Sequence, residues 1–243
     1  MRSLVVLLAL LPLSVHAQEG EWTYSANIYA WIPGLDASVQ TPLGELNSRS
    51  SGGNVLDNLD MAFMGTFEAR RDKWGLLFDG VYAKLSTSKD TPFGLAFSQG
   101  EIATELSAVS GYALYRSYDT ERLTADIGLG LRAFDVDLDI GLDAGQIGGD
   151  RAFGGSKSWV VPLVAGRFTA PISEKWFATA YFDYGQTSGD DTTWQGVATI
   201  GYRFNERWAV QGGYRHMELE QEIGGLDSDI SLSGPVIGLN FRF

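Results

Sequence analysis

The sequence predicts an all-β fold, a transmembrane antiparallel up-and-down β-barrel of about ten strands. Three observations indicate this fold class. Apolar and polar residues alternate along most of the chain, which is the period of a β-strand. Beyond the first residues, no apolar run reaches the roughly 20 residues that a membrane-spanning helix needs. Short polar turns alternate with long connections, which is typical of membrane barrels.

A targeting segment is predicted at residues 1–17. Arg2 supplies the positive start, and an apolar stretch follows from Leu4 to Leu13. The small residues of Val15-His16-Ala17 fit a signal-peptidase site, so we expect cleavage after Ala17. The remaining chain, 18–243, is long enough for a single large β-barrel domain.

Charge and composition limit the possible functions. The chain carries 18 Lys and Arg against 30 Asp and Glu, a net charge of −12, and loss of Arg2 gives −12 − 1 = −13. A strongly acidic chain argues against nucleic acid as a partner, because nucleic acid requires a basic face. The sequence has no cysteine and therefore no disulfide framework. Nothing in it predicts a cofactor.

Ten alternating runs are the predicted strands. The first ends at Pro33-Gly34, and the last ends at the C-terminus. An eight-stranded barrel would leave alternation unexplained. A twelve-stranded barrel would need a further hairpin within 35–60, where Leu35, Ala37 and Val39 alternate, and that alternative stays open. The runs are 22–32, 61–70, 74–85, 101–116, 122–136, 158–170, 176–185, 193–204, 208–219 and 229–243.

A repeated turn indicates how the barrel is oriented. An acidic residue, a basic residue and Trp follow one another at 72–74, 174–176 and 206–208. Trp prefers the headgroup layer of a membrane, while the two charges stay in water. We therefore expect a girdle of Trp22, Trp74, Trp176 and Trp208 at the short-turn end. The other end would hold the long connections and Trp31, Trp159 and Trp194; these connections are 33–60, 86–100, 137–157, 186–192 and 220–228.

Charged residues occupy the faces opposite the apolar ones, which fits a barrel lumen better than the core of a sandwich. One interpretation is a ladder of ion pairs that fills a narrow barrel. The other is a charged constriction that selects small ions or solutes. The predicted lumen residues are Glu68, Arg70, Asp79, Glu105, Asp126, Arg132, Arg167, Asp183, Arg203, Gln211, Arg215, Asn240 and Arg242.

Asp135, Asp137 and Asp139 are weak candidates for a metal site. Their spacing begins like a calcium-binding loop, and carboxylates suit Ca²⁺ or Mg²⁺. Position twelve of such a loop would be Gln146 instead of glutamate. The simpler interpretation is a strand that extends beyond the membrane with an acidic edge.

His216 is the only histidine left after loss of the targeting segment. The simpler interpretation is a histidine at the rim of the barrel, since neither an Asp-x-His nor a His-x-Ser arrangement surrounds it. A catalytic role stays open as an alternative, because catalytic triads are assembled in space and not in sequence.

The C-terminal strand resembles a known assembly signal. It ends in alternating apolar residues with Phe241 and a final Phe243, which is similar to the signal read by the barrel-assembly machinery of Gram-negative outer-membrane β-barrel proteins. Segments 31–34, 56–64, 68–70 and 74–76 resemble an uncharacterised branch of that superfamily. The resemblance implies an outer-membrane location, short turns in the periplasm, and lipid and lipopolysaccharide as surroundings. The assembly machinery and periplasmic chaperones would act during biogenesis. It implies no activity.

For function, the sequence favours a non-enzymatic outer-membrane barrel. It would be either a narrow, porin-like channel for small solutes or ions, or a structural surface barrel. The alternative is a binding or adhesion protein that acts through 33–60 and 137–157. A membrane-embedded hydrolase that uses His216 is the third hypothesis.

Overall fold

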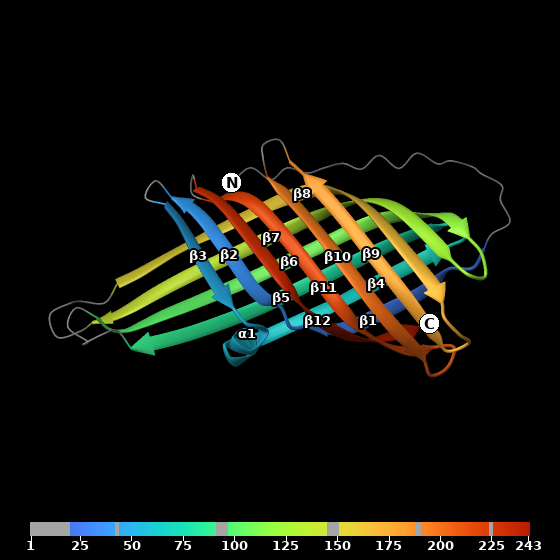
Figure 1. Ribbon diagram of the computed structural model, residues 1–243, viewed down its shortest axis with the longest axis horizontal. Helices are drawn as coiled ribbons and strands as arrows, with labels where there is room; N and C mark the ends of the chain where they lie inside the picture. The colour runs from blue at the N-terminus through green and yellow to red at the C-terminus, as the bar shows by residue number, and fades with distance from the viewer. Residues whose placement is uncertain (1–19, 42–43, 91–96, 145–150, 188–190, 224–225) are drawn as a thin grey trace.

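The computed structural model is a closed antiparallel β-barrel (Figure 1). It describes residues 20–41, 44–90, 97–144, 151–187, 191–223 and 226–243, so the predicted targeting segment lies outside the described residues. No helix in these ranges is both long and apolar enough to cross a membrane.

Ten strands form the ring, which confirms the predicted fold class and strand number. Neighbours in sequence pair antiparallel, and the first strand closes the ring against the last, from Ser25 opposite Arg242 to Trp31 opposite Val236. Closure pairs the backbone groups that hydrocarbon could not satisfy. The strands are β1 (Thr23–Trp31), β4 (Leu59–Arg71), β5 (Trp74–Asp90), β6 (Phe97–Asp119), β7 (Thr124–Ala144), β8 (Arg151–Pro171), β9 (Trp176–Gln186), β10 (Thr192–Arg203), β11 (Trp208–Ile223) and β12 (Leu226–Arg242).

The connection from β1 to β4 contains a hairpin of β2 (Gly34–Thr41) and β3 (Gly44–Ser50), followed by α1 (Gly52–Asp57). β2 continues β1 beyond Pro33 and pairs with the other half of β12. The hairpin lies on the rim and adds nothing to the ring, so the twelve-stranded alternative is wrong. Arg49 of β3 donates to Asp36 of β2, and this bond raises the pKa of the guanidinium.

The helix α1 is a single capped turn with no buried residue. The hydroxyl of Ser51 accepts a hydrogen bond from the backbone N–H of Asn54, a standard N-cap arrangement. α1 therefore does not fill the interior of the barrel.

Four consecutive strands are much longer than a membrane requires. β5 to β8 have 17, 23, 21 and 21 residues, whereas about 9–11 tilted residues cross a bilayer. They project as a green and yellow extension past the other strands (Figure 1). The described residues of the predicted long loops at 86–100 and 137–157 are therefore strand, which corrects the sequence prediction. Where a strand extends into water, both of its faces accept polar residues. The alternation of apolar and polar residues is therefore lost there, although the strands remain hydrogen-bonded to one another.

The outer face of the ring is apolar, with Ile28, Leu129 and Ile237 among its exposed side chains. At the short-turn end, Trp22, Trp74, Trp176 and Trp208 are exposed on the outer surface. The turn before Trp74 places Asp72 at φ 52°, a left-handed conformation that Asp tolerates better than most residues.

The two terminal phenylalanines belong to this aromatic belt. Phe241 lies against Trp208 with ring centroids 4.6 Å apart, and Phe243 stacks on Tyr24 at 5.8 Å. Of the three tryptophans expected at the far rim, Trp194 lies on the outer wall. Trp31 and Trp159 belong to the apolar cluster inside the barrel.

The main apolar cluster of the protein sits inside the barrel, and most of it lies in the half away from the short turns. Phe134 stacks on Trp159 with centroids 4.9 Å apart. These side chains fill the lumen at that level, as interior residues do in narrow barrels. Its most buried members include Trp31, Met64, Val81, Ala108, Leu114, Phe134, Val161, Leu163, Met217 and Leu219.

Candidate functional site

Most of the predicted lumen residues point into the barrel. Glu105 is the exception and corrects the prediction. Ser110 on the same strand is buried in the lumen, so Glu105, five positions earlier, faces outward, where Tyr82 donates to it at 2.8 Å. The residues that face inward are Glu68, Arg70, Asp79, Asp126, Arg132, Arg167, Asp183, Arg203, Gln211, Arg215, Asn240 and Arg242.

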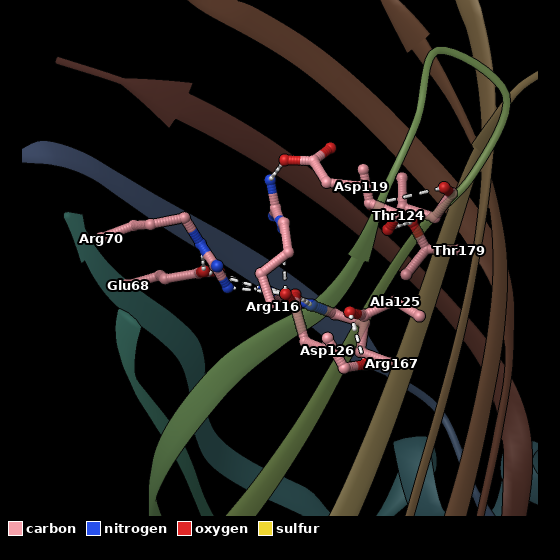
Figure 2. A network of polar contacts seen from close by, with 11 residues as sticks. Glu68, Arg70, Arg116, Asp119, Thr124, Ala125, Asp126, Arg167 and Thr179 are labelled. Atoms are coloured by element: carbon pink, nitrogen blue, oxygen red, sulfur yellow. Dashed lines mark hydrogen bonds and ion pairs between the residues drawn. The ribbon is translucent and has the colours of Figure 1, made fainter. Parts of the chain in front are cut away.

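A network of three arginines and two carboxylates occupies the short-turn half of the lumen (Figure 2). Arg167 donates to both oxygens of Glu68 at 2.6 and 2.8 Å. It also donates to Asp126 at 2.7 Å, and Arg70 and Arg116 reach the same carboxylate at 3.0 and 3.1 Å. These groups come from β4, β6, β7 and β8, so the network links one wall of the barrel to another.

A second network lies deeper in the barrel. Arg132 of β7 forms an ion pair with Asp183 of β9 at 2.7 Å, and both side chains have an exposed fraction of 0%. Arg132 also donates to the hydroxyl of Tyr112, and that hydroxyl donates to Asp183 at 2.8 Å. Gln195 gives the carboxylate a further donor at 2.5 Å. Burial of both charges is tolerated because each is paired and hydrogen-bonded.

A third network repeats this arrangement on other strands. Arg215 of β11 pairs with Asp79 of β5 at 3.0 Å and donates to the hydroxyl of Tyr29 at 2.7 Å. The Tyr29 hydroxyl donates to Asp79 at 2.6 Å. In both networks a tyrosine hydroxyl accepts from the arginine and donates to the aspartate. The ring of Trp31 lies 4.7 Å from the Arg215 guanidinium, a favourable cation–π contact.

The networks leave a cavity of about 860 Å³ at the short-turn end, lined at its mouth by Arg203, Arg207 and Arg242. Its inner lining includes Asp79, Tyr112 and Arg215. Beyond these lie the buried Arg132–Asp183 pair and the apolar cluster. The barrel is thus hollow at the short-turn end and filled in the other half.

A different polar group lies on the outer wall. His216 of β11 points outward, and its Nδ1 lies 2.5 Å from the hydroxyl of Ser233 on β12. Its Nε2 lies 3.3 Å from a carboxylate oxygen of Glu218. The Trp194 ring of β10 packs against the imidazole, with centroids 4.5 Å apart. A hydroxyl, an imidazole and a carboxylate are therefore connected in series.

Carboxylates also converge beside this group. Ligand atoms of Glu218, Glu220 and Asp229 lie within 4.8 Å of one another. The predicted metal candidates Asp135, Asp137 and Asp139 do not meet in this way in the described part of the chain. They occupy every second position of β7, so successive carboxylates on that face are separated by about 6.6 Å. Asp135 instead accepts a hydrogen bond from the Ser158 hydroxyl.

Several residues of these groups were absent from the sequence prediction, among them Arg116, Gln195, Tyr29, Tyr112 and Ser233. Tyr29 and Tyr112 looked like ordinary strand residues, although their inward positions beside charged neighbours are a usable signal. Ser233 lies 17 residues from His216 and becomes its neighbour only through the register of β11 and β12, which places the two opposite each other.

The sequence matches no family model and no curated protein. Among solved structures, the chain is similar to the outer membrane protease OmpT of Escherichia coli, with TM-score 0.65 and 9% identity over 93% of this chain and 99% of that one. Weaker matches include Ail of Yersinia pestis (TM-score 0.38, 11% identity, 93% and 100% covered) and the P. putida toluene transporter TodX (TM-score 0.38, 10% identity, 93% and 90% covered). The likeness to OmpT shows the fold: the chain is a closed β-barrel of the outer-membrane type, as the resemblance implied.

Proposed function

We propose that this protein is a sealed, non-conducting barrel of the bacterial outer membrane, and that its charged interior is structural. The apolar outer belt and the tryptophan girdle support a membrane position, with the short turns in the periplasm. The targeting segment is removed after Ala17 during export. Lipid and lipopolysaccharide surround the barrel, and the assembly machinery recognises the strand that ends in Phe241 and Phe243.

The proposal rests mainly on the burial of the charged side chains at mid-height in the lumen. An ion-selective constriction presents its charges to a hydrated path. Here Arg132 and Asp183 have exposed fractions of 0%, and an apolar cluster covers the level above them. Between the two interpretations of the charged lumen, the geometry favours the ladder of ion pairs over the channel.

Reconstitution into planar bilayers tests the proposal. The purified barrel should give no stepwise conductance under conditions in which a general porin, added as a positive control, conducts readily. Stepwise currents whose ion selectivity changes in Asp126→Asn or Arg132→Gln would show that the lumen conducts and would overturn the proposal.

Surface binding is a second candidate, favoured by the extension of β5 to β8. A paired sheet presents a firmer surface than a loop, and exposed carboxylates such as Asp135 and Asp139 lie on its outer face. Cells that carry the protein should lose adhesion to a basic surface such as polylysine when residues 140–152 are deleted. Heat-modifiable migration of the barrel in gels should survive the deletion. Unchanged adhesion would remove this candidate.

A further inference from the structure

We infer that Ser233, His216 and Glu218 form a catalytic triad that hydrolyses carboxylic esters of acylated lipids in the outer leaflet. The inference goes beyond the proposed function, because it concerns the outer wall and does not depend on whether the lumen conducts. Serine hydrolysis requires a hydroxyl beside one nitrogen of an imidazole whose other nitrogen is held by a carboxylate.

The carboxylate fixes which nitrogen can act as the base. An ionised Glu218 only accepts hydrogen bonds, so Nε2 of His216, at 3.3 Å, must carry the proton between them. Nδ1 is then the acceptor, and it lies 2.5 Å from Ser233 Oγ. The hydroxyl of Ser233 therefore donates to the one ring nitrogen that can accept its proton, which is the ground state of an activated serine.

The height of the group on the wall identifies the class of substrate. His216 lies eight residues beyond Trp208 on β11, which for a tilted strand is roughly 20 Å above the girdle. That level is near the outer edge of the apolar belt, which is about 25 Å tall in such barrels. Ester groups of outer-leaflet lipids lie at this boundary between acyl chains and headgroups.

The residues around the triad show the same boundary. On the wall below it, Tyr214 and Ile237 are exposed apolar side chains that can contact acyl chains. Above it, Glu220 and Asp229 are polar and exposed. Trp194 covers one side of the imidazole and limits its orientations. An acyl chain can thus lie on the wall with its ester beside Ser233.

The reaction uses water as its only co-reactant. Ser233 Oγ attacks the ester carbonyl carbon while its proton moves to His216 Nδ1, and the carbonyl electron pair moves to oxygen. Collapse of this intermediate breaks the bond to the alcohol, which takes the proton from Nδ1 and leaves an acyl-serine. Water then attacks the acyl-serine with His216 as base, which releases a fatty acid and restores the hydroxyl. Glu218, with Glu220 and Asp229 nearby, stabilises the positive charge on the imidazole in both steps.

Accessibility separates this group from the lumen networks. The side chains of His216 and Glu218 are both 28% exposed, so substrate and water can reach them, while the Arg132–Asp183 pair is fully enclosed. Among the described residues, no other imidazole exists to serve as a base.

A fluorophosphonate probe tests for the activated serine. The purified full-length barrel in detergent is labelled and digested with trypsin, which releases residues 216–242 as one peptide whose serines are Ser228, Ser231 and Ser233. The label should map to Ser233 and vanish in Ser233→Ala. It should persist in Ser231→Ala, a matched serine two positions away on the same strand. His216→Ala should slow labelling by about 100-fold or more.

Absence of label from a correctly folded wild-type barrel would overturn the triad, as would equal labelling of His216→Ala. Heat-modifiable migration in gels verifies the fold of each variant.

Two lipid substrates identify the source of the ester. The barrel is reconstituted in phosphatidylethanolamine vesicles or in lipopolysaccharide, and free fatty acid is measured. Release from either one that is lost in Ser233→Ala supports the inference and names the substrate. If the probe labels Ser233 but neither lipid releases fatty acid, the assignment to outer-leaflet lipids is wrong.

Discussion

The lumen and the outer wall use similar polar groups under different conditions. Inside, arginines, aspartates and tyrosines form closed networks, and the central Arg132–Asp183 pair is shielded from solvent. On the wall, His216 and Glu218 form a chain with a serine, and both remain partly exposed. The two regions therefore differ in how far solvent reaches their ionisable groups, although the kinds of groups are similar.

Arg132→Leu should have the largest effect on stability. It leaves Asp183 as an unpaired buried charge, and breaking a buried pair costs about 3–5 kcal/mol. Urea unfolding in lipid vesicles, followed by tryptophan fluorescence, measures the free energy of unfolding. The double variant Arg132→Leu/Asp183→Leu should recover most of the loss, because it removes both charges. A double variant as unstable as the single one would contradict a purely structural pair.

Tyr29→Phe should have an intermediate effect. It removes the hydroxyl that joins Arg215 to Asp79, and lost buried hydrogen bonds cost about 1–3 kcal/mol. Tyr112→Phe should cost a similar amount by the same urea unfolding, because its hydroxyl holds the same position in the other network. Tyr214→Phe on the lipid-facing wall is the matched control. If Tyr29→Phe and Tyr112→Phe lowered the free energy of unfolding no more than Tyr214→Phe does, the buried tyrosine hydroxyls would contribute nothing to stability.

His216→Ala should change stability least. Substitutions on an exposed surface usually stay within about 0.5 kcal/mol, while probe labelling of Ser233 should be lost. The same unfolding measurement on wild type and variant checks this. A large destabilisation by His216→Ala would assign the histidine a structural role. The group on the outer wall would then stabilise the barrel in the same way as the lumen networks.

The fold could be predicted from the sequence because alternation and the repeated turn reflect the membrane itself. Lipid imposes an apolar outer face over a fixed height, and the girdle tryptophans mark its lower edge. Above the membrane this constraint ends. For this reason 86–100 and 137–157 looked like loops, although their described residues are strand, and the prediction placed Glu105 on the wrong face.

The candidate sites could be predicted only in part. Inward charges such as Arg132 and Asp183 follow from alternation within one strand. Their partners depend on which strands meet across the barrel, and that information is absent from any local pattern. His216 illustrates the limit: its local sequence argued against catalysis, while Ser233 became its neighbour through strand register alone.

The two Arg–Tyr–Asp networks also differ in when they can form. Tyr112, Arg132 and Asp183 lie on β6, β7 and β9, within one stretch of the chain. Tyr29 and Arg215 are separated by 186 positions and belong to the first strand and the last but one. Contacts between distant parts of a chain form late, because long loops must close first. We therefore expect the Tyr29–Arg215 contact to form only as the ring closes, so that it stabilises the completed barrel and not its open precursors.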